Sequence, residues 1–286
     1  MKKIFLSIIL LLAICTQALA ESSLWKVQKG ESVLFLGGTF HLLRPSDFPL
    51  PPEFARAYQA SDFLVFETDL GKFNAPATQQ KLMAQAMYAD GSTIDKHLSP
   101  ETYKLLGEYC ALKGVQLENI KHLKPSVISL AMTALELSQF GVAPEGVDLF
   151  LYHLAIRDKK GTAGLESIDE QIQFIATMGD GDEDAYVTYF LKDIESIRQD
   201  YETMVAAWKK GDTVKIDALF VAELKTKMPK LYKELLTDRN AKWLPLIEAY
   251  HKTPAREFVL VGVGHLAGPD GIIAALRRKG YTVEKL

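Results

Sequence analysis

Residues 35–45 read FLGGTFHLLRP: an apolar run ends in two glycines, and His41 follows the second glycine by three positions. The pattern returns near the other end of the chain, where FVLVGVGH (258–265) places His265 three residues after a glycine. A residue without a Cβ atom lets the backbone turn sharply and approach a ligand closely. The repeated Gly-x-x-His pattern therefore predicts two strands that each deliver an imidazole to one shared site.

Short apolar runs around these motifs predict a buried sheet. SVLFLGG (32–38) and DFLVFETD (62–69) are bounded by polar or glycine residues, and Pro52 can open a helix between them. A strand–helix–strand unit favours a right-handed parallel crossover. Further strands are predicted at 160–167, 256–265 and 281–286.

The middle of the chain shows helical spacing of apolar residues instead. Helices are predicted at about 76–88, 99–113, 125–140, 145–158, 168–178, 184–209, 213–223 and 228–251. The predicted fold class is therefore α/β, with a mixed or mostly parallel sheet built from both ends of the chain. The same pattern predicts a single domain over 21–286 that carries a large helical insertion, roughly 76–160 and 168–251.

The N-terminus matches a secretory signal peptide over residues 1–20. Two lysines precede an apolar run, and Ala18-Leu19-Ala20 fits a cleavage site before Glu21. The run is shorter than the roughly 20 residues that a membrane-spanning helix needs. We therefore expect export to the periplasm or the medium, with no stable membrane insertion after cleavage. An uncleaved N-terminal anchor is the alternative.

Composition excludes several classes of protein. The formal net charge is −3, and it would become −5 after the loss of Lys2 and Lys3. No basic stripe with interleaved aromatics is present, so we expect no nucleic-acid partner. Cleavage would leave Cys110 as the only cysteine, which excludes an internal disulfide and a multi-thiolate metal site. The sequence contains no H-E-x-x-H, G-x-S-x-G or P-loop motif.

Four polar side chains follow predicted strands, namely His41, Glu67, Glu166 and His265. In open parallel sheets, ligands bind beyond the carboxyl ends of the strands. Two imidazoles and two carboxylates suit a divalent ion, with Mn²⁺ or Co²⁺ expected and Zn²⁺ or Fe²⁺ as alternatives. Each residue alone also has a plainer interpretation: a polar loop histidine, a solvated strand end, or a neighbour of a helix N-cap.

Two further pairs of residues carry weaker signals. Arg239 and Asn240, in LLTDRNAKW, could clamp an anion or orient a substrate, or could lie on a plain surface helix. Glu145 and Asp148 fall in the first turn of a predicted helix, where the helix dipole favours carboxylates. That dipole and a role in the site remain alternative explanations for this second pair.

Several segments together resemble the TraB/GumN family, which also takes in the animal Tiki proteins. In chain order they are GTFH, SDFLVFETD, GVDLFLYHLA, GLES, RNAKW and VGVGHLAGPDGIIAALRRKGY. The resemblance implies a single α/β domain with a helical insertion. From the Tiki branch it implies a metal-dependent protease that uses His41, His265 and Glu67. Glu166, Arg239 and Asn240 fall in matching segments.

The resulting hypothesis is an exported metal-dependent hydrolase of peptide or amide bonds. A bound metal would polarise a carbonyl and lower the pKa of a water molecule. Glu67 or Glu166 would complete the ligand set or act as general base, and both roles remain open. Arg239 and Asn240 would hold substrate or an oxyanion. The alternative is an exported protein that binds a peptide, pheromone or haem without turnover; the expected partner is a peptide or small molecule, and the oligomeric state is open.

Overall fold

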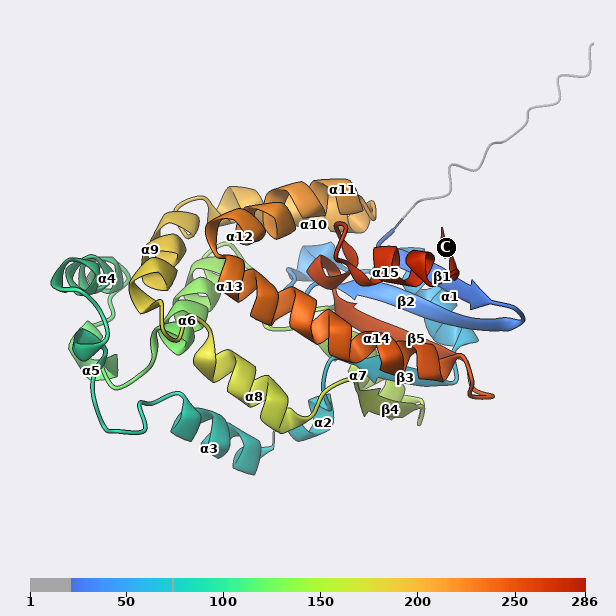
Figure 1. Cartoon of the computed structure of the whole chain (residues 1–286), viewed down its shortest axis with the longest axis horizontal. Coiled ribbons are helices and arrows are strands. Elements are labelled where there is room, and N and C mark those ends of the chain that lie inside the picture. The colour runs from blue at the N-terminus through green and yellow to red at the C-terminus, as the bar shows by residue number, and fades with distance from the viewer. Residues whose placement is uncertain (1–21, 74) are drawn as a thin grey trace, which may run out of the picture.

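The computed structural model describes residues 22–73 and 75–286, so the predicted signal peptide lies outside the described residues. At its centre is a six-stranded sheet in the order β4-β3-β5-β2-β1-β6 (Figure 1). The strands are β1 (Leu24–Lys29), β2 (Ser32–Thr39), β3 (Phe63–Phe66), β4 (Gly161–Gly164), β5 (Glu257–Gly262) and β6 (Thr282–Lys285). This mixed α/β architecture confirms the predicted fold class.

Strand direction divides the sheet into two parts. β4, β3, β5 and β2 are mutually parallel, whereas β1 is antiparallel to both β2 and β6. β1 and β2 form a hairpin in which Lys29 pairs with Ser32 and Gly30 has φ +60°. A two-residue hairpin loop needs positive φ, which glycine adopts without strain. β1 was not among the predicted strands.

The sheet is covered by helices on both faces. Leu34 and Leu36 contact the core on one face, and Phe35 contacts the core on the other, as the two-residue period of a strand requires. The first face is covered by α14 (Asp238–Tyr250) and α15 (Ile272–Arg278), and the second by α1 (Pro52–Ala60) and α7 (Val147–Arg157). Such two-sided burial explains why the strands read as continuous apolar runs.

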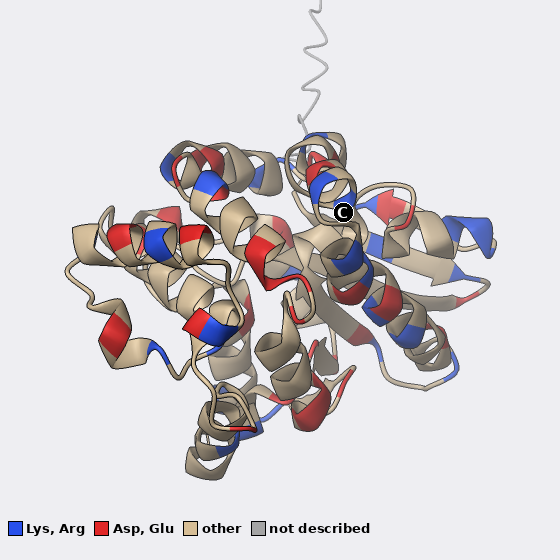
Figure 2. Ribbon diagram, turned by 60° about the vertical axis from the view of Figure 1, so that its left-hand side comes forward, with Lys and Arg blue, Asp and Glu red and all other residues tan. Residues whose placement is uncertain are grey.

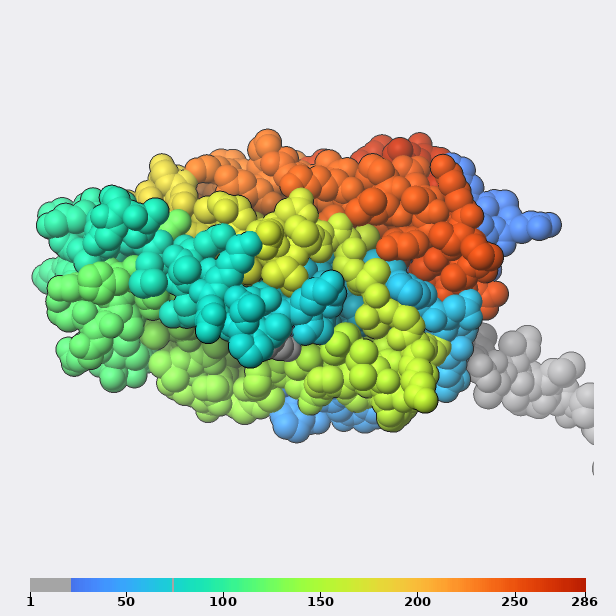
Figure 3. Space-filling view, turned by 90° about the horizontal axis from the view of Figure 1, so that it is seen from below, coloured from blue at the N-terminus to red at the C-terminus, as the bar shows by residue number. Residues whose placement is uncertain are grey.

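The remaining helices come mainly from the segments between β3 and β4 and between β4 and β5, and most of them lie to the left of the sheet in Figure 1. They are α2 (Leu70–Phe73), α3 (Pro76–Gln85), α4 (Pro100–Leu112), α5 (Leu117–Ile120), α6 (Pro125–Ser138), α8 (Ile168–Thr177), α9 (Glu183–Asp193), α10 (Ile197–Lys209), α11 (Thr213–Ile216), α12 (Ala222–Lys227) and α13 (Pro229–Tyr232). Figure 3 shows α3 and α8 lying side by side. The division into one domain with an insertion stays a prediction.

Some helix predictions were wrong in detail. The single helix predicted over 184–209 is two helices, because α9 ends at Asp193 and α10 begins at Ile197. Neither Gly nor Pro lies between them, so no helix-breaking residue marks the interruption. Two π-helical turns also interrupt the last predicted helices: η3 (Asp217–Val221) and η4 (Lys233–Thr237).

Charged residues of both signs are interspersed over the helices in the view of Figure 2. Within the part of the chain that the structure describes, no helix combines the length and the apolar character needed to cross a bilayer.

Candidate functional site

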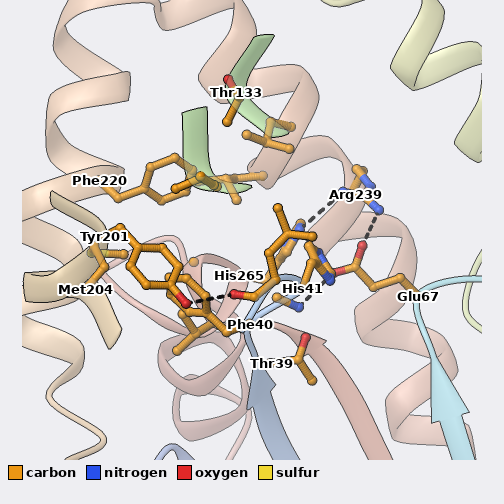
Figure 4. A pocket seen from close by; sticks show the side chains of 17 residues that line it. Thr39, Phe40, His41, Glu67, Thr133, Tyr201, Met204, Phe220, Arg239 and His265 are labelled. Atoms are coloured by element: carbon orange, nitrogen blue, oxygen red, sulfur yellow. Dashed lines mark hydrogen bonds and ion pairs between the residues drawn. The ribbon is translucent and has the colours of Figure 1, made fainter. Parts of the chain in front are cut away.

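The two Gly-x-x-His motifs leave the sheet side by side. β2 and β5 are parallel neighbours, and Thr39 pairs with Gly262 at their carboxyl ends. His41 follows β2 by two residues, and His265 lies in a 3₁₀ turn, η5 (Val263–Leu266), directly after β5. Figure 4 shows that both imidazoles face the same cavity.

Gly262 marks the point where three candidate side chains meet. A Cβ atom built on this glycine would lie 3.2 Å from Glu67 Oε1, 3.6 Å from His41 Nε2 and 3.7 Å from His265 Cδ2. Because glycine lacks a Cβ atom, the space between the three polar groups stays open. The glycine of the second Gly-x-x-His motif therefore serves the site itself, because it leaves room between these three side chains.

His41 is oriented by a carboxylate from α7. Its Nδ1 lies 2.8 Å from Asp148 Oδ2, and the negative charge of Asp148 raises the pKa of His41 to about 9. The start of α7 packs directly on the loop after β2, since a Cβ on Gly146 would lie 2.2 Å from the carbonyl oxygen of Phe40. In this arrangement His41 is protonated at neutral pH.

His265 is buried and, unlike His41, uncharged. Its Nδ1 lies 2.7 Å from Asn240 Oδ1, and its ring is only 4.5 Å from the Trp243 ring, centroid to centroid. An amide oxygen can only accept, so Nδ1 carries the proton and Nε2 keeps its lone pair. Burial lowers the pKa of His265 to about 3, which leaves the ring neutral at physiological pH.

Glu67 follows β3 and is held as a carboxylate. Its Oε1 accepts the backbone N–H of Gly262 at 2.7 Å, and its Oε2 accepts Nη2 of Arg239 at 2.7 Å. Burial opposes ionisation, but Arg239 and the two imidazoles outweigh it and lower the pKa of Glu67 to about 2. Glu67 is thus ionised across the physiological range.

Glu166 follows β4 and lies behind Arg239. It accepts Arg239 Nη2 at 2.8 Å and Nε at 3.1 Å, and Trp243 Nε1 donates to it at 3.2 Å. Burial raises the pKa of Glu166 despite the neighbouring guanidinium. Glu166 lines a separate surface groove, whereas Glu67 lines both cavities that His41 lines. The structure therefore brings five of the candidates together, namely His41, Glu67, Arg239, Asn240 and His265, and links Glu166 to them through Arg239.

His41, His265 and Glu67 are the kinds of side chain that bind a divalent ion, but their spacing in this structure does not form a metal site. Among residues 22–73 and 75–286, no group of three or more His, Cys, Asp or Glu side chains is compact enough to hold a metal. Arg239 contacts two of the donors, at 2.7 Å from Glu67 and 3.3 Å from His265 Nε2. Each histidine nevertheless presents Nε2 while an oxygen atom fixes Nδ1, as is common for metal-bound histidines. In this structure the Arg239 guanidinium thus contacts both Glu67 and His265.

Two cavities meet at this cluster. The larger has a volume of about 450 Å³ and the smaller about 210 Å³, and both are lined by His41 and Glu67. Of these two cavities, Arg239 and His265 line the larger and Asp148 lines the smaller. A ligand that extends across His41 and Glu67 can therefore contact both.

Some residues of the cluster had little or no signal in the sequence. Asp148 was recognisable only as a first-turn acid, and its contact with His41 spans 107 positions. Gln171 accepts from Arg239 at 3.2 Å, and Trp243 donates to Glu166, but no motif marks either residue. The side-chain contacts of the fold, rather than local spacing, assign these roles.

The fold and this cluster define a class of α/β protein in which two histidines and a glutamate meet at the carboxyl edge of a mostly parallel sheet. Residues 23–285 match the model of the TraB/PrgY/gumN family, and the chain belongs to that family. It is 26% identical over 320 aligned residues to a Danio rerio protein named metalloprotease TIKI1. The match covers 92% of this chain and 63% of that protein, so the chain spans less than two thirds of the relative. No solved structure matches it.

Proposed function

We propose that this protein is an exported metal-dependent hydrolase that cleaves peptide or amide bonds at the histidine cluster. The observation that carries the proposal is the convergence of His41, His265 and Glu67 on Gly262. The similarity to a relative named as a metalloprotease supports the same reaction class. Two imidazoles and a carboxylate are suitable ligands for Mn²⁺, Co²⁺, Zn²⁺ or Fe²⁺.

Each of the three side chains has a distinct part in the proposed site. His41 and His265 would hold the ion through Nε2, and Glu67 through Oε1. When bound, the ion would polarise a carbonyl and lower the pKa of a water molecule. Glu67, with a pKa of about 2, is a weak proton acceptor, and its permanent charge suits a ligand better than a general base. The assignment leaves Glu166 as a support for Arg239.

Arg239 and Asn240 would then act in different ways. Arg239 lines the larger cavity, and a guanidinium can donate to a carbonyl oxygen that gains negative charge. Asn240 instead uses both ends of its amide on the protein: Oδ1 contacts His265 Nδ1, and Nδ2 donates to the carbonyls of His265 and Asp270. Asn240 is therefore a positioning residue for His265.

The proposed activity can be tested with metal-depleted protein to which Mn²⁺ or Co²⁺ is returned. The protein should cleave a fluorogenic peptide library with multiple turnovers, and only after the metal is added. His41→Ala and His265→Ala should each reduce kcat/KM by at least about 100-fold, because residues that act as a unit fail together. His122→Ala is the matched control, since His122 is exposed and outside the cluster. Unchanged cleavage in both site variants would refute the proposal.

The apolar lining of the larger cavity favours a second candidate. The protein could bind a peptide, pheromone or haem at the same place without turnover. Retention of one ligand per protein molecule, with no cleavage at any metal concentration, would select this binding role over the hydrolase.

A further inference from the structure

The larger cavity separates charge from apolar surface. Its charged side chains, His41, Glu67 and Arg239, lie at one end, where Glu67 pairs with Arg239 beside His265. The opposite wall is formed by uncharged side chains, including Leu137, Met204 and Phe220. Figure 4 shows this division plainly, with Phe220, Met204 and Tyr201 on one side of the imidazoles and Arg239 and Glu67 on the other. A ligand that reaches the reactive cluster therefore meets an uncharged surface directly beside it.

The apolar wall is built by helices that are distant in sequence. Leu137 comes from α6 and Met204 from α10, while Phe220 lies in the π-helical turn η3 and Leu235 in η4. π-Helical turns are rare and are often found at functional sites. Phe220 also packs on the second motif itself, since a Cβ on Gly264 would lie 2.7 Å from its ring. The wall is thus fixed in position relative to His265.

The wall retains apolar surface that the protein does not cover. Met204, Phe220 and Leu235 are only half-buried although they line a cavity. The volume of about 450 Å³ lies in the range of known ligand pockets, roughly 300–1,000 Å³. Apolar side chains of a ligand would gain by covering this surface, whereas a charged side chain placed against the wall would lose its hydration and find no polar partner among Met204, Phe220 and Leu235.

We propose that the larger cavity receives a bulky apolar side chain next to the bond that is cleaved. The substrate class is then peptides with Leu, Met or Phe beside the scissile bond, and the metal-dependent hydrolysis proposed above is the reaction on which this inference rests. The apolar wall selects the substrate, and the histidine cluster that lines the same cavity acts on the adjacent amide.

The first test is a peptide series that differs only in the residue beside the cleaved bond. With Mn²⁺-loaded protein, kcat/KM for Leu, Met or Phe should exceed that for Asp by at least about 100-fold, because burying an unpaired charge is costly. Met204→Lys places a cation in the wall with little change of length, so it should lower cleavage of the Leu peptide and raise that of the Asp peptide. Leu112→Lys, at a position 82% exposed, is the control and should keep the wild-type preference.

A binding measurement separates this inference from the proposed activity. Non-cleavable peptides with a reduced bond at the same place can be titrated into metal-free protein by calorimetry. The Leu peptide should bind at least about 10-fold tighter than the Asp peptide, and both Met204→Lys and Phe220→Ala should reduce that ratio. Thermal melting checks that the variants fold. If Met204→Lys does not fold, the result for Phe220→Ala decides the test.

The outcomes are distinct for the two proposals. Apolar preference in binding without cleavage of any peptide would refute the hydrolase and support the apolar cavity. Cleavage with equal rates for Leu and Asp peptides, or Met204→Lys indistinguishable from Leu112→Lys, would overturn the apolar cavity alone. Neither binding nor cleavage would overturn both.

Discussion

Asp148 Oδ2 lies 2.8 Å from His41 Nδ1, and this contact joins the start of α7 to the loop after β2. It has two consequences for the site. It fixes the ring so that Nε2 faces Gly262, and the charge of Asp148 raises the pKa of the imidazole to about 9, so an ion held at Nε2 would have to displace the Nε2 proton. Metal binding should therefore release a proton from His41.

Replacing Asp148 should change both the pKa and the metal affinity of His41. Asp148→Asn keeps an acceptor but removes the charge, so the pKa of His41 should fall from about 9 towards its usual 6.5. NMR titration of the metal-free protein measures this shift. Metal affinity should weaken by about 10–100-fold, as for other partners of metal-bound histidines. Glu145→Gln is the control, because Glu145 lies 3.6 Å from His153 instead. A His41 pKa that stays near 9 in Asp148→Asn would contradict the assigned cause.

Removing Arg239 should destabilise the protein in a pH-dependent way. With Arg239 present, the Glu67 pKa is about 2, below its usual value of 4.5, so this carboxylate stabilises the fold above pH 4.5 and loses that effect as the pH falls towards 2. In Arg239→Gln, burial without the cation would raise the Glu67 pKa. The ionised Glu67 would then destabilise the fold instead of stabilising it. The free energy of unfolding should drop by about 3–5 kcal/mol at pH 7. The difference from wild type should shrink at pH 4.

Urea unfolding of metal-free protein at the two pH values measures this effect. Arg157→Gln is the control, because Arg157 pairs with Asp158 on the exposed surface and should matter much less. If Arg239→Gln shows the same loss of stability at pH 4 as at pH 7, the charge of Glu67 is not what Arg239 compensates.

Export predicts a defined N-terminus. Intact-mass analysis of protein from the periplasm or medium should give a chain that begins at Glu21, because the apolar segment ends at an A-x-A site. Recovery of full-length protein with Met1 in the membrane fraction would instead show the uncleaved anchor.

Much of the sheet could be predicted from the sequence because its strands are buried on both faces. SVLFLGG and FVLVG are continuous apolar runs that end in glycine, and these runs are β2 and β5. β1 was missed although LWKVQK pairs with β2 through a two-residue loop. The break after Asp193 has no Gly or Pro to announce it, and tertiary packing decides it.

Only those parts of the site that belong to a local sequence motif could be predicted. The two Gly-x-x-His motifs indicated a shared site because parallel strand ends meet at one edge, and β2 and β5 are neighbours. The contact between Asp148 and His41 and the place of Glu166 behind Arg239 depend on side chains from separate helices. Such long-range contacts leave no trace in the spacing of residues.

The proposed function requires that His41 and His265 bind one metal ion. Crystals soaked in Mn²⁺ and measured at its absorption edge test this most directly, because anomalous scattering locates the ion without assumption. We predict one peak beside Gly262, within bonding distance of both Nε2 atoms and of Glu67, with the Arg239 guanidinium displaced from Glu67. A peak elsewhere, or no peak at a Mn²⁺ concentration that supports peptide cleavage, would contradict the account.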